Sequence, residues 1–205
     1  MIKIENIAIS GWKAAIRGMR NPMNSWDKSD SQFSENGLVK DIGLEDARLM
    51  KQLVQAGSDH SKFMRMINVT VDVTAPLYWW KEADTYKVGT VRNSCSTMHK
   101  ISAKEFELDD FSHEHLDTET LLILKNVIWS LNVSRDCFLS DKKNKSYWWQ
   151  MIQLLPSSYN QRATLQLNYA VLRNIYHSRK NHKLDEWHDF CDWIESLPYA
   201  ELITL

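Results

Sequence analysis

Residues 65–76 read RMINVTVDVTAP, and this stretch decides the fold. Apolar and polar side chains alternate through it without a break, and successive side chains of a β-strand point to opposite faces. The apolar residues of the alternation are Ile67, Val69, Val71 and Val73. The pattern predicts a strand over 65–74 with one buried face. Pro76 then opens a helix predicted over 77–85, because proline is tolerated in the first helical turn.

The rest of the chain adds one more strand and a series of helices. Residues 1–9, MIKIENIAI, alternate well enough to predict a short strand. Helical periodicity bounded by Gly, Asn and Pro predicts helices over 11–19, 44–56, 116–131, 145–155, 163–179 and 184–197. In the second of these helices, the face expected to be buried carries Leu49, Leu53 and Ala56. The polar run over 24–36 predicts a loop.

These elements predict an α+β fold, with a small twisted antiparallel sheet and a larger share of helix. A chain of 205 residues suits one domain over 1–205 and is long enough to bury a core. With 25 basic and 26 acidic residues the net charge is -1, which argues against general nucleic-acid binding. Neither a secretory signal nor a membrane-length apolar run is present, so a soluble, cytoplasmic protein is expected.

The cysteines and histidines give no catalytic or metal-binding pattern. Cys95, Cys137 and Cys191 are scattered without a C-x-x-C pair and are expected to be free, buried thiols. His113 and His115 have no third ligand at a characteristic spacing, so no metal site is predicted. No serine or cysteine nucleophile stands in a recognisable motif.

The polar run after Pro76 is the first candidate for ligand binding. Lys87 and Arg92 flank Gly89, and glycine lets the backbone approach a ligand closely. Nearby hydroxyl groups that can donate to phosphate oxygens belong to Thr90, Ser94, Ser96 and Thr97. The run is either a solvated loop or a small anion site. The adjacent Trp79 and Trp80 are expected to pack in the core, since neighbouring helical side chains point about 100° apart.

The helix predicted over 163–179 supplies the second candidate. Within it, Asn168, Leu172, Ile175 and Arg179 fall within roughly 60° of one another. Polar groups on an otherwise apolar stripe need partners. Asn168 and Arg179 are therefore either satisfied inside the protein or face a ligand.

In their order, these segments resemble one family, the flavin-dependent thymidylate synthases. There a helix ending in glycine leads to a strand that closes in Ala-Pro, and residues 49–76 are similar to it. The family signature R-H-R-x-x-S-x-N-x-x-S-x-R aligns without a gap with residues 85–97. Residues 167–187, LNYAVLRNIYHSRKNHKLDEW, resemble the later family segment of a helix followed by Arg, His and Trp. The resemblance covers roughly residues 10 to 195.

The resemblance assigns roles residue by residue. It implies nucleotide contacts from Lys87, Thr90, Arg92, Cys95, Ser96, Thr97 and Arg179. It implies flavin contacts from Thr85, Tyr86, Lys87, Asn168, Asn174 and His182. Arg179 would be the catalytic residue, binding the pyrimidine carbonyls and stabilising negative charge that develops on the ring. The signature has changed: Thr85 and Tyr86 replace its first Arg and His, and Thr97 replaces its last Arg.

The family reaction is the reductive methylation of dUMP to dTMP. Methylenetetrahydrofolate donates a carbon and reduced FAD supplies hydride, so the protein mainly positions the reactants. The resemblance thus implies a methyltransferase of nucleotide biosynthesis with FAD as cofactor, NADPH and methylenetetrahydrofolate as co-substrates, and a homotetramer that shares active sites between subunits. The scaffold motifs are kept while the signature has changed. A second hypothesis is therefore a nucleotide-binding protein without redox chemistry. A third is a tryptophan-rich scaffold for protein partners.

Overall fold

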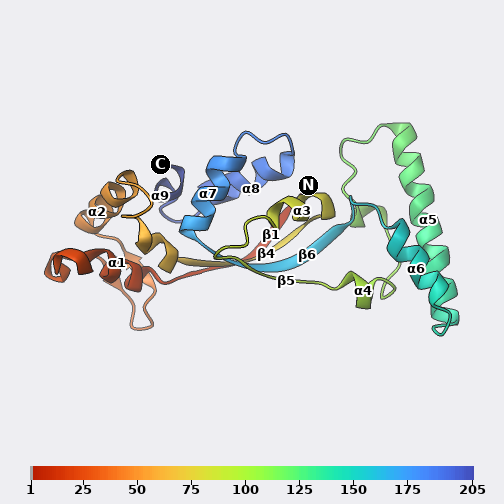
Figure 1. The fold of residues 1–205 in the computed structure, drawn as a ribbon, viewed down its shortest axis with the longest axis horizontal. Helices are drawn as coiled ribbons and strands as arrows, with labels where there is room; N and C mark the ends of the chain where they lie inside the picture. Colours follow the sequence, from red (N-terminus) through yellow and green to blue (C-terminus); the bar gives the residue numbers. More distant parts are fainter. Residues whose placement is uncertain (1) are drawn as a thin grey trace. The chain divides into compact units, whose positions relative to one another are not determined.

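The computed structural model describes residues 2–205 and confirms an α+β fold with a small antiparallel sheet (Figure 1). The main sheet has four strands in the order β1-β4-β6-β5, and a separate pair joins β2 to β3 in antiparallel fashion. The strands are β1 (Lys3–Ser10), β2 (Gln32–Phe33), β3 (Val39–Asp41), β4 (Asn68–Pro76), β5 (Val91–Ser94) and β6 (Asn160–Asn168).

Along the sequence, the helices lie before, between and after these strands. They are α1 (Trp12–Arg20), α2 (Leu44–Gln55), α3 (Leu77–Ala83), α4 (Thr97–Lys100), α5 (Thr118–Ser140), α6 (Lys145–Leu154), α7 (Tyr169–Arg179), α8 (Asp185–Glu195) and α9 (Glu201–Thr204). Short 3-10 turns lie at Asn21–Met23, Trp26–Lys28, Lys62–Met66 and Leu108–Asp110. In the part of the chain described, no helix is both long and apolar enough to cross a membrane.

The alternating stretch within residues 65–76 forms β4, as predicted. All four of its apolar side chains are fully buried: Ile67, Val69, Val71 and Val73 each expose 0%. The strand itself begins at Asn68, because Lys62–Met66 forms a 3-10 turn. A proline at position 76 ends the strand, and α3 follows directly.

The helix predicted over 163–179 is wrong in its first third. Residues up to Asn168 form β6, and only Tyr169–Arg179 is helical. The buried residues of this strand are Ala163, Leu165 and Leu167, at 1%, 4% and 2% exposure, while Thr164 and Gln166 are exposed. That is a period of two, and a nine-residue strand joined to a helix can mimic one long helix in sequence.

Three further elements differ from their predictions. The buried face of α2 carries Asp46, Met50 and Val54, one residue along from the predicted stripe, and Ala56 is exposed. Asp46 can lie on this buried face because its charge is satisfied inside the protein. Helix α5 runs on to Ser140, well beyond the predicted end. The run over 24–36 is a loop with a 3-10 turn and strand β2 inserted.

The chain divides into two compact units, so the single domain over 1–205 stays a prediction. Unit 1 comprises Met1–Lys3, Val73–Asp84 and Asn93–Ala163. Unit 2 comprises Ile4–Asp72, Thr85–Arg92 and Thr164–Leu205. All four strands of the main sheet, β1, β4, β5 and β6, contribute residues to both units.

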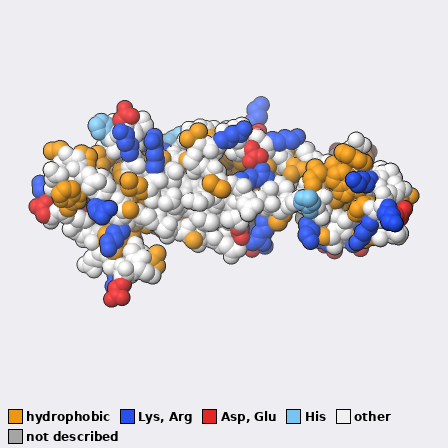
Figure 2. All heavy atoms as spheres, turned by 60° about the horizontal axis from the view of Figure 1, so that its bottom comes forward, with side chains coloured by type: hydrophobic (Ala, Val, Ile, Leu, Met, Phe, Trp, Pro, Cys, Tyr) orange, Lys and Arg blue, Asp and Glu red, His pale blue; other side chains and the backbone are white. Residues whose placement is uncertain are grey.

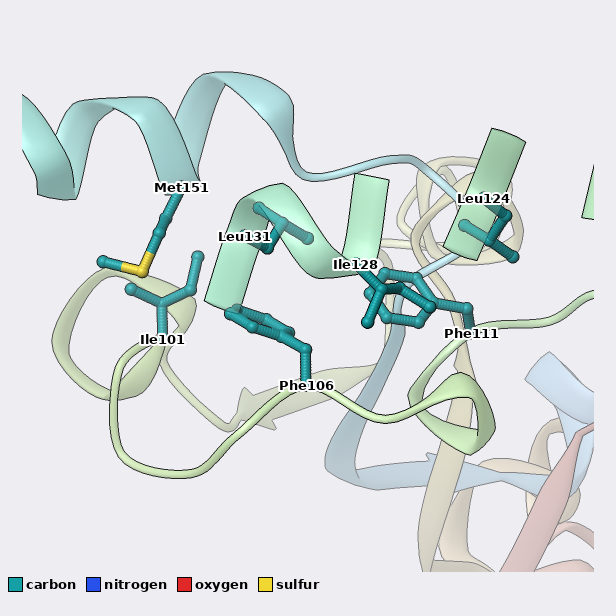
Figure 3. Packing of buried hydrophobic residues seen from close by; sticks show 7 residues of the cluster. All are labelled: Ile101, Phe106, Phe111, Leu124, Ile128, Leu131 and Met151. Atoms are coloured by element: carbon teal, nitrogen blue, oxygen red, sulfur yellow. The ribbon is translucent and has the colours of Figure 1, made fainter. Parts of the chain in front are cut away.

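Unit 1 has its own hydrophobic core beneath α5 and α6. Figure 3 shows its seven buried side chains, with Met151 of α6 pointing toward Ile101. The cluster consists of Ile101, Phe106, Phe111, Leu124, Ile128, Leu131 and Met151. Trp79 and Trp80 also lie in this unit, at 1% and 2% exposure, which confirms that they pack rather than face solvent.

Unit 2 is organised around α7. Tyr169 at its start is fully buried, donates a hydrogen bond from its hydroxyl to the carbonyl of Pro198 at 2.6 Å, and meets Trp12 edge-on at 5.2 Å. This anchors the start of the helix in the core of the unit.

The three thiols are free, but only Cys191 is buried. Cys95 is exposed and Cys137 half-buried, so the prediction of buried thiols is wrong for both. Cys95 directly follows β5, a strand with no buried residue.

Candidate functional site

Asn168 sets where α7 begins. The prediction placed Asn168 inside a helix, but in the structure it caps one. Its side-chain oxygen accepts a hydrogen bond from the Val171 backbone N–H at 3.0 Å. Capping by asparagine satisfies an amide that the helix cannot bond internally. The helix then buries Leu172 and Ile175 and ends at Arg179, where a cation is favoured by the helix dipole.

Arg179 is held by two aromatic residues of unit 2. Its Nε donates a hydrogen bond to the hydroxyl of Tyr86 at 2.8 Å. The guanidinium carbon lies 5.5 Å from the Tyr86 ring centre and 4.9 Å from the Trp187 ring centre. These distances are within the range of cation–π attraction. The two rings meet edge-on at 6.2 Å and so fix the orientation of the guanidinium.

His182 belongs to the same cluster. Its ring packs edge-on against Trp187 at 6.3 Å between centres. The Leu184 backbone N–H donates to Nδ1 of His182 at 3.2 Å, so Nδ1 acts as an acceptor. In a neutral imidazole the other nitrogen, Nε2, then carries the proton. We name the set Tyr86, Arg179, His182 and Trp187 the arginine cluster.

The loop leading from Tyr86 meets the start of α7 at a glycine. Gly89 has φ of 79°, a left-handed conformation that favours glycine. A Cβ built there would lie 3.1 Å from the Asn168 Nδ2 and 3.1 Å from a methyl of Val171. The next hydroxyl, Thr90 Oγ1, is buried and has no hydrogen-bond partner within residues 2–205. A buried, unsatisfied hydroxyl costs roughly 1–3 kcal/mol, so the turn is suited to a ligand that accepts a hydrogen bond.

Replacing Gly89 with alanine tests this close approach. We expect Gly89→Ala to lose about 2 kcal/mol of unfolding free energy, because the new methyl meets Asn168 and Val171 in addition to the left-handed strain. Gly37 is a matched control, since it has the same φ of 79° with nothing within 4 Å of its added Cβ. Gly37→Ala should lose only about 1 kcal/mol. Equal losses in urea denaturation would show that the Gly89 turn yields without disturbing α7.

The last residues of the signature lie in unit 1, where they line a pocket of about 220 Å³. The pocket is lined by Cys95, Ser96, Thr97, Lys100, Ile101, Lys104, Asp110, Tyr159, Asn160, Gln161 and Arg162. Backbone pairing holds its rim, since the Cys95 N–H donates to the Arg162 carbonyl at 2.9 Å. Gln161 Nε2 also donates to the Cys95 carbonyl at 2.7 Å.

The charge of this pocket is positive on balance. Lys100, Lys104 and Arg162 supply three cations against the single carboxylate of Asp110. The hydrogen bond from Lys104 to Asp110 raises the pKa of the lysine, and burial raises the pKa of Tyr159. At neutral pH the lysine is therefore charged and the tyrosine neutral. Such a lining suits a small anion such as a phosphate group.

The predicted site residues are divided between the two units. In unit 2, Tyr86, Arg179 and His182 form one cluster, with Thr90 and Asn168 at the Gly89 turn. The remaining predicted residues of this unit are the exposed Thr85, Lys87 and Asn174 and the half-buried Arg92 of β5. In unit 1, Cys95, Ser96 and Thr97 line the pocket.

Sequence reasoning missed the cations that complete this pocket. Lys100 and Lys104 lie around the end of the four-residue helix α4, which is too short to show periodicity. Arg162 lies near the start of β6, just before the segment predicted as a helix over 163–179. Among residues 2–205, no group of three or more His, Cys, Asp or Glu side chains is arranged to hold a metal ion.

Comparison with known proteins places the fold. No protein-family model and no curated protein matches the sequence. Two crystal structures of thymidylate synthase X (ThyX) from Helicobacter pylori, both containing FAD and dUMP, match along essentially the whole chain. One is 15% identical, covers 100% of both chains and has a TM-score of 0.71; the other is 16% identical, covers 99% of this chain and 97% of its own, and has a TM-score of 0.68. The chain therefore has the fold of thymidylate synthase X.

Proposed function

We propose that this chain binds a pyrimidine nucleotide such as dUMP and, with FAD, catalyses its reductive methylation to dTMP. One observation carries the proposal. The signature segment and the end of α7 meet in the arginine cluster, where Tyr86 accepts a hydrogen bond from Arg179 at 2.8 Å. The shared fold with an enzyme solved with FAD and dUMP supports it.

Arg179 is the proposed catalytic residue. Two rings and a hydrogen bond orient its guanidinium. The side chain is therefore held in one conformation, and its N–H donors point in a fixed direction. Preorganised donors aimed at a pyrimidine carbonyl would stabilise negative charge as it develops on the ring. Since Trp187 is fully buried, the cluster keeps the cation against a poorly solvated wall, where its charge acts more strongly.

The Gly89 turn packs directly against the start of α7, where an added Cβ would lie 3.1 Å from Asn168 and from Val171. Thr90 Oγ1 beside it is a buried polar atom without a partner among residues 2–205. We assign Tyr86, Asn168 and His182, with the exposed Thr85 and Asn174, to the flavin side of the site and Thr90 to the nucleotide, with the exposed Lys87 as a cation for phosphates. Bound FAD would supply the hydride, and methylenetetrahydrofolate the carbon, with NADPH as reductant.

We propose that the pocket of unit 1 binds a phosphate group. Lys100, Lys104 and Arg162 provide positive charge, and the hydroxyls of Ser96 and Thr97 can donate hydrogen bonds to phosphate oxygens. We propose a cytoplasmic enzyme that works as a homotetramer, as the resemblance implies.

The first test is the absorbance spectrum of the purified protein before and after incubation with FAD and desalting. Retained flavin bands in the visible region are expected. Calorimetry with dUMP should then give a dissociation constant in the micromolar range, and dTMP should form when all co-substrates are present. A protein that retains no flavin and shows no affinity for dUMP contradicts the proposal.

A second candidate is a nucleotide-binding protein without redox chemistry. The observation that favours it is the changed signature: Thr85, Tyr86 and Thr97 stand where the family has Arg, His and Arg. On this account dUMP binds to flavin-free protein with the same affinity whether or not FAD is added. The two candidates are separated by the spectrum: flavin retention together with tighter dUMP binding supports the enzyme.

A further inference from the structure

Unit 2 contains a pocket of about 440 Å³ that shares no residue with the proposed site. It lies where α7, the end of α8 and α9 come together. Its lining combines two glutamates, two tyrosines and two apolar residues: Glu195, Glu201, Tyr176, Tyr199, Leu197 and Ala200. Among the described residues, no lysine, arginine or histidine lines it. The volume is within the range of roughly 300–1,000 Å³ that is usual for small-molecule sites.

The acidic lining is a local feature of this pocket. On the face of the molecule drawn in Figure 2, acidic and basic side chains are intermixed. The whole chain carries 25 basic and 26 acidic residues. A pocket whose charged lining is acidic alone therefore concentrates negative potential at a place that a cation can enter.

The first carboxylate, that of Glu195, is held in place by a tyrosine. Tyr176 of α7 donates a hydrogen bond from its hydroxyl to Glu195 Oε1 at 2.6 Å. This bond raises the pKa of Tyr176 to about 12, so the phenol stays neutral and remains a donor at physiological pH. Within residues 2–205 this is the only hydrogen bond of the Glu195 side chain. The carboxylate is therefore oriented and still has lone pairs for a ligand.

The second carboxylate, that of Glu201, already contacts an ammonium group. Lys51 Nζ of α2 lies 3.5 Å from Glu201 Oε1, and the two side chains expose 48% and 47%. An exposed pair of this kind is weak, so Glu201 can accept a second ammonium group at little cost. Lys180 Nζ likewise lies 5.6 Å from the centre of the Tyr176 ring. Two lysines outside the lining thus show which chemistry these groups attract.

Tyr199 is fixed in the pocket wall by the core of unit 2. Its φ is 56°, in the left-handed region that favours glycine. Trp12 is buried and packs edge-on against both Tyr199 and Tyr169, at 5.2 Å between ring centres in each case. The Tyr169 hydroxyl also donates to the carbonyl of Pro198, the residue before Tyr199. These contacts maintain a strained backbone and hold the aromatic wall in one position.

This combination of groups fits an organic cation with two charges. Carboxylates bind ammonium groups through charge-assisted hydrogen bonds, and the faces of tyrosine rings attract cations. Leu197 and Ala200 add apolar surface against which methylene groups can pack. A metal ion fits poorly, because no group of three or more His, Cys, Asp or Glu side chains within residues 2–205 is arranged to hold one.

We propose that this pocket binds a linear aliphatic diamine, with one ammonium group at Glu195 and the other at Glu201. The ring faces of Tyr176 and Tyr199 form the walls beside the charged ends. The proposal does not depend on the proposed function, because no residue assigned to nucleotide or flavin lines this pocket. Diamine binding is measured without either of them.

Calorimetry with diaminobutane tests the site, and butylamine is the matched control ligand. Diaminobutane should bind with a dissociation constant on the order of 1 mM or below, and butylamine at least about tenfold more weakly. Since both amines are protonated at neutral pH, the comparison isolates the contact made by the second ammonium group. Absence of diaminobutane binding, or equal binding of the two amines, overturns the proposal.

Glu195→Gln and Glu201→Gln test the two contacts separately. Each should weaken diaminobutane binding by about five- to tenfold, because glutamine keeps the shape of the side chain and loses its charge. Glu35→Gln is the matched control and should bind as the native chain does, since Glu35 is an exposed glutamate of unit 2 outside the pocket. All three side chains are exposed, so each variant should keep its thermal unfolding midpoint. Equal weakening by Glu35→Gln would mean that net charge alone attracts the amine, and the proposal fails.

Lys51 gives a test in the opposite direction. Its ammonium group competes with the ligand for Glu201, so Lys51→Gln should strengthen diaminobutane binding by about two- to threefold. Weaker binding by this variant would contradict a direct contact between the diamine and Glu201.

Discussion

Replacing Asp46 with alanine should lower the free energy of unfolding by about 3–5 kcal/mol, because it removes one partner of a buried ion pair. Arg20 and Asp46 expose 4% and 0%, and Arg20 Nε donates to Asp46 Oδ1 at 2.6 Å. The other carboxylate oxygen accepts bonds from the hydroxyls of Ser29 and Ser31, both at 2.7 Å, and from two backbone N–H groups. In a chain of this size the midpoint of thermal unfolding should fall by on the order of 10 °C.

The same site predicts how stability depends on pH. Burial by itself would raise the pKa of Asp46, but hydrogen bonds from Ser31, Ser29 and Arg20 outweigh it and hold the pKa below its ordinary value. A carboxyl with a lowered pKa in the folded state stabilises the protein fully above its unfolded pKa of about 3.9. That contribution is lost as the pH falls through the folded pKa. Asp46→Ala should therefore show a shallower loss of stability in acid than the native chain.

Two variants control for side effects. Asp27 is an exposed aspartate of the same unit, and Asp27→Ala should change stability by no more than about 0.5 kcal/mol. The double variant Arg20→Met, Asp46→Leu removes the unpaired Arg20 charge and should recover only that part of the loss. The hydroxyls of Ser29 and Ser31 and the two backbone N–H groups still lose their acceptor. An Asp46→Ala protein as stable as the native chain in guanidinium denaturation would mean that water or another residue replaces the carboxylate.

Replacing Arg179 with glutamine should weaken dUMP binding by about 100-fold, equivalent to roughly 2.7 kcal/mol. Glutamine keeps some hydrogen bonding but removes the charge and the planar guanidinium held by Tyr86 and Trp187. Turnover should fall further than binding, because a charge that meets the reacting ring matters most in the transition state. Calorimetry and steady-state kinetics on the same preparation separate the two effects.

Arg179→Lys and Arg173→Gln complete this experiment. Lysine keeps the charge without the fork, so it should recover only part of the affinity. Arg173 is a half-buried arginine on the same helix, and six residues away it points about 120° from Arg179. Arg173→Gln should therefore bind dUMP as the native chain does. If both glutamine variants lose affinity equally, the effect belongs to the charge of α7 as a whole, and Arg179 has no specific role.

The elements with unbroken local patterns could be read from the sequence. The strand β4, the turn at Pro76 and the helix α8 follow from side-chain period, proline chemistry and helix-end residues, all of which act within a few positions. Strand β6 could not be read in this way, because Asn168 both ends the strand and caps the helix, and the two periods run together. Pairing with β4 and β5 makes residues 160–168 a strand.

The sequence by itself determined where the candidate residues Arg179 and Tyr86 stand along the chain. Only the tertiary structure decided that they meet. Tyr86 and Arg179 are 93 positions apart, and Asp46 is buried beside Met50 and Val54 on α2 because it pairs with Arg20. Local patterns record how each segment can expose or bury a face. Contacts between distant segments depend on the packing of the whole unit, where hydrophobic burial and satisfied polar groups are optimised together.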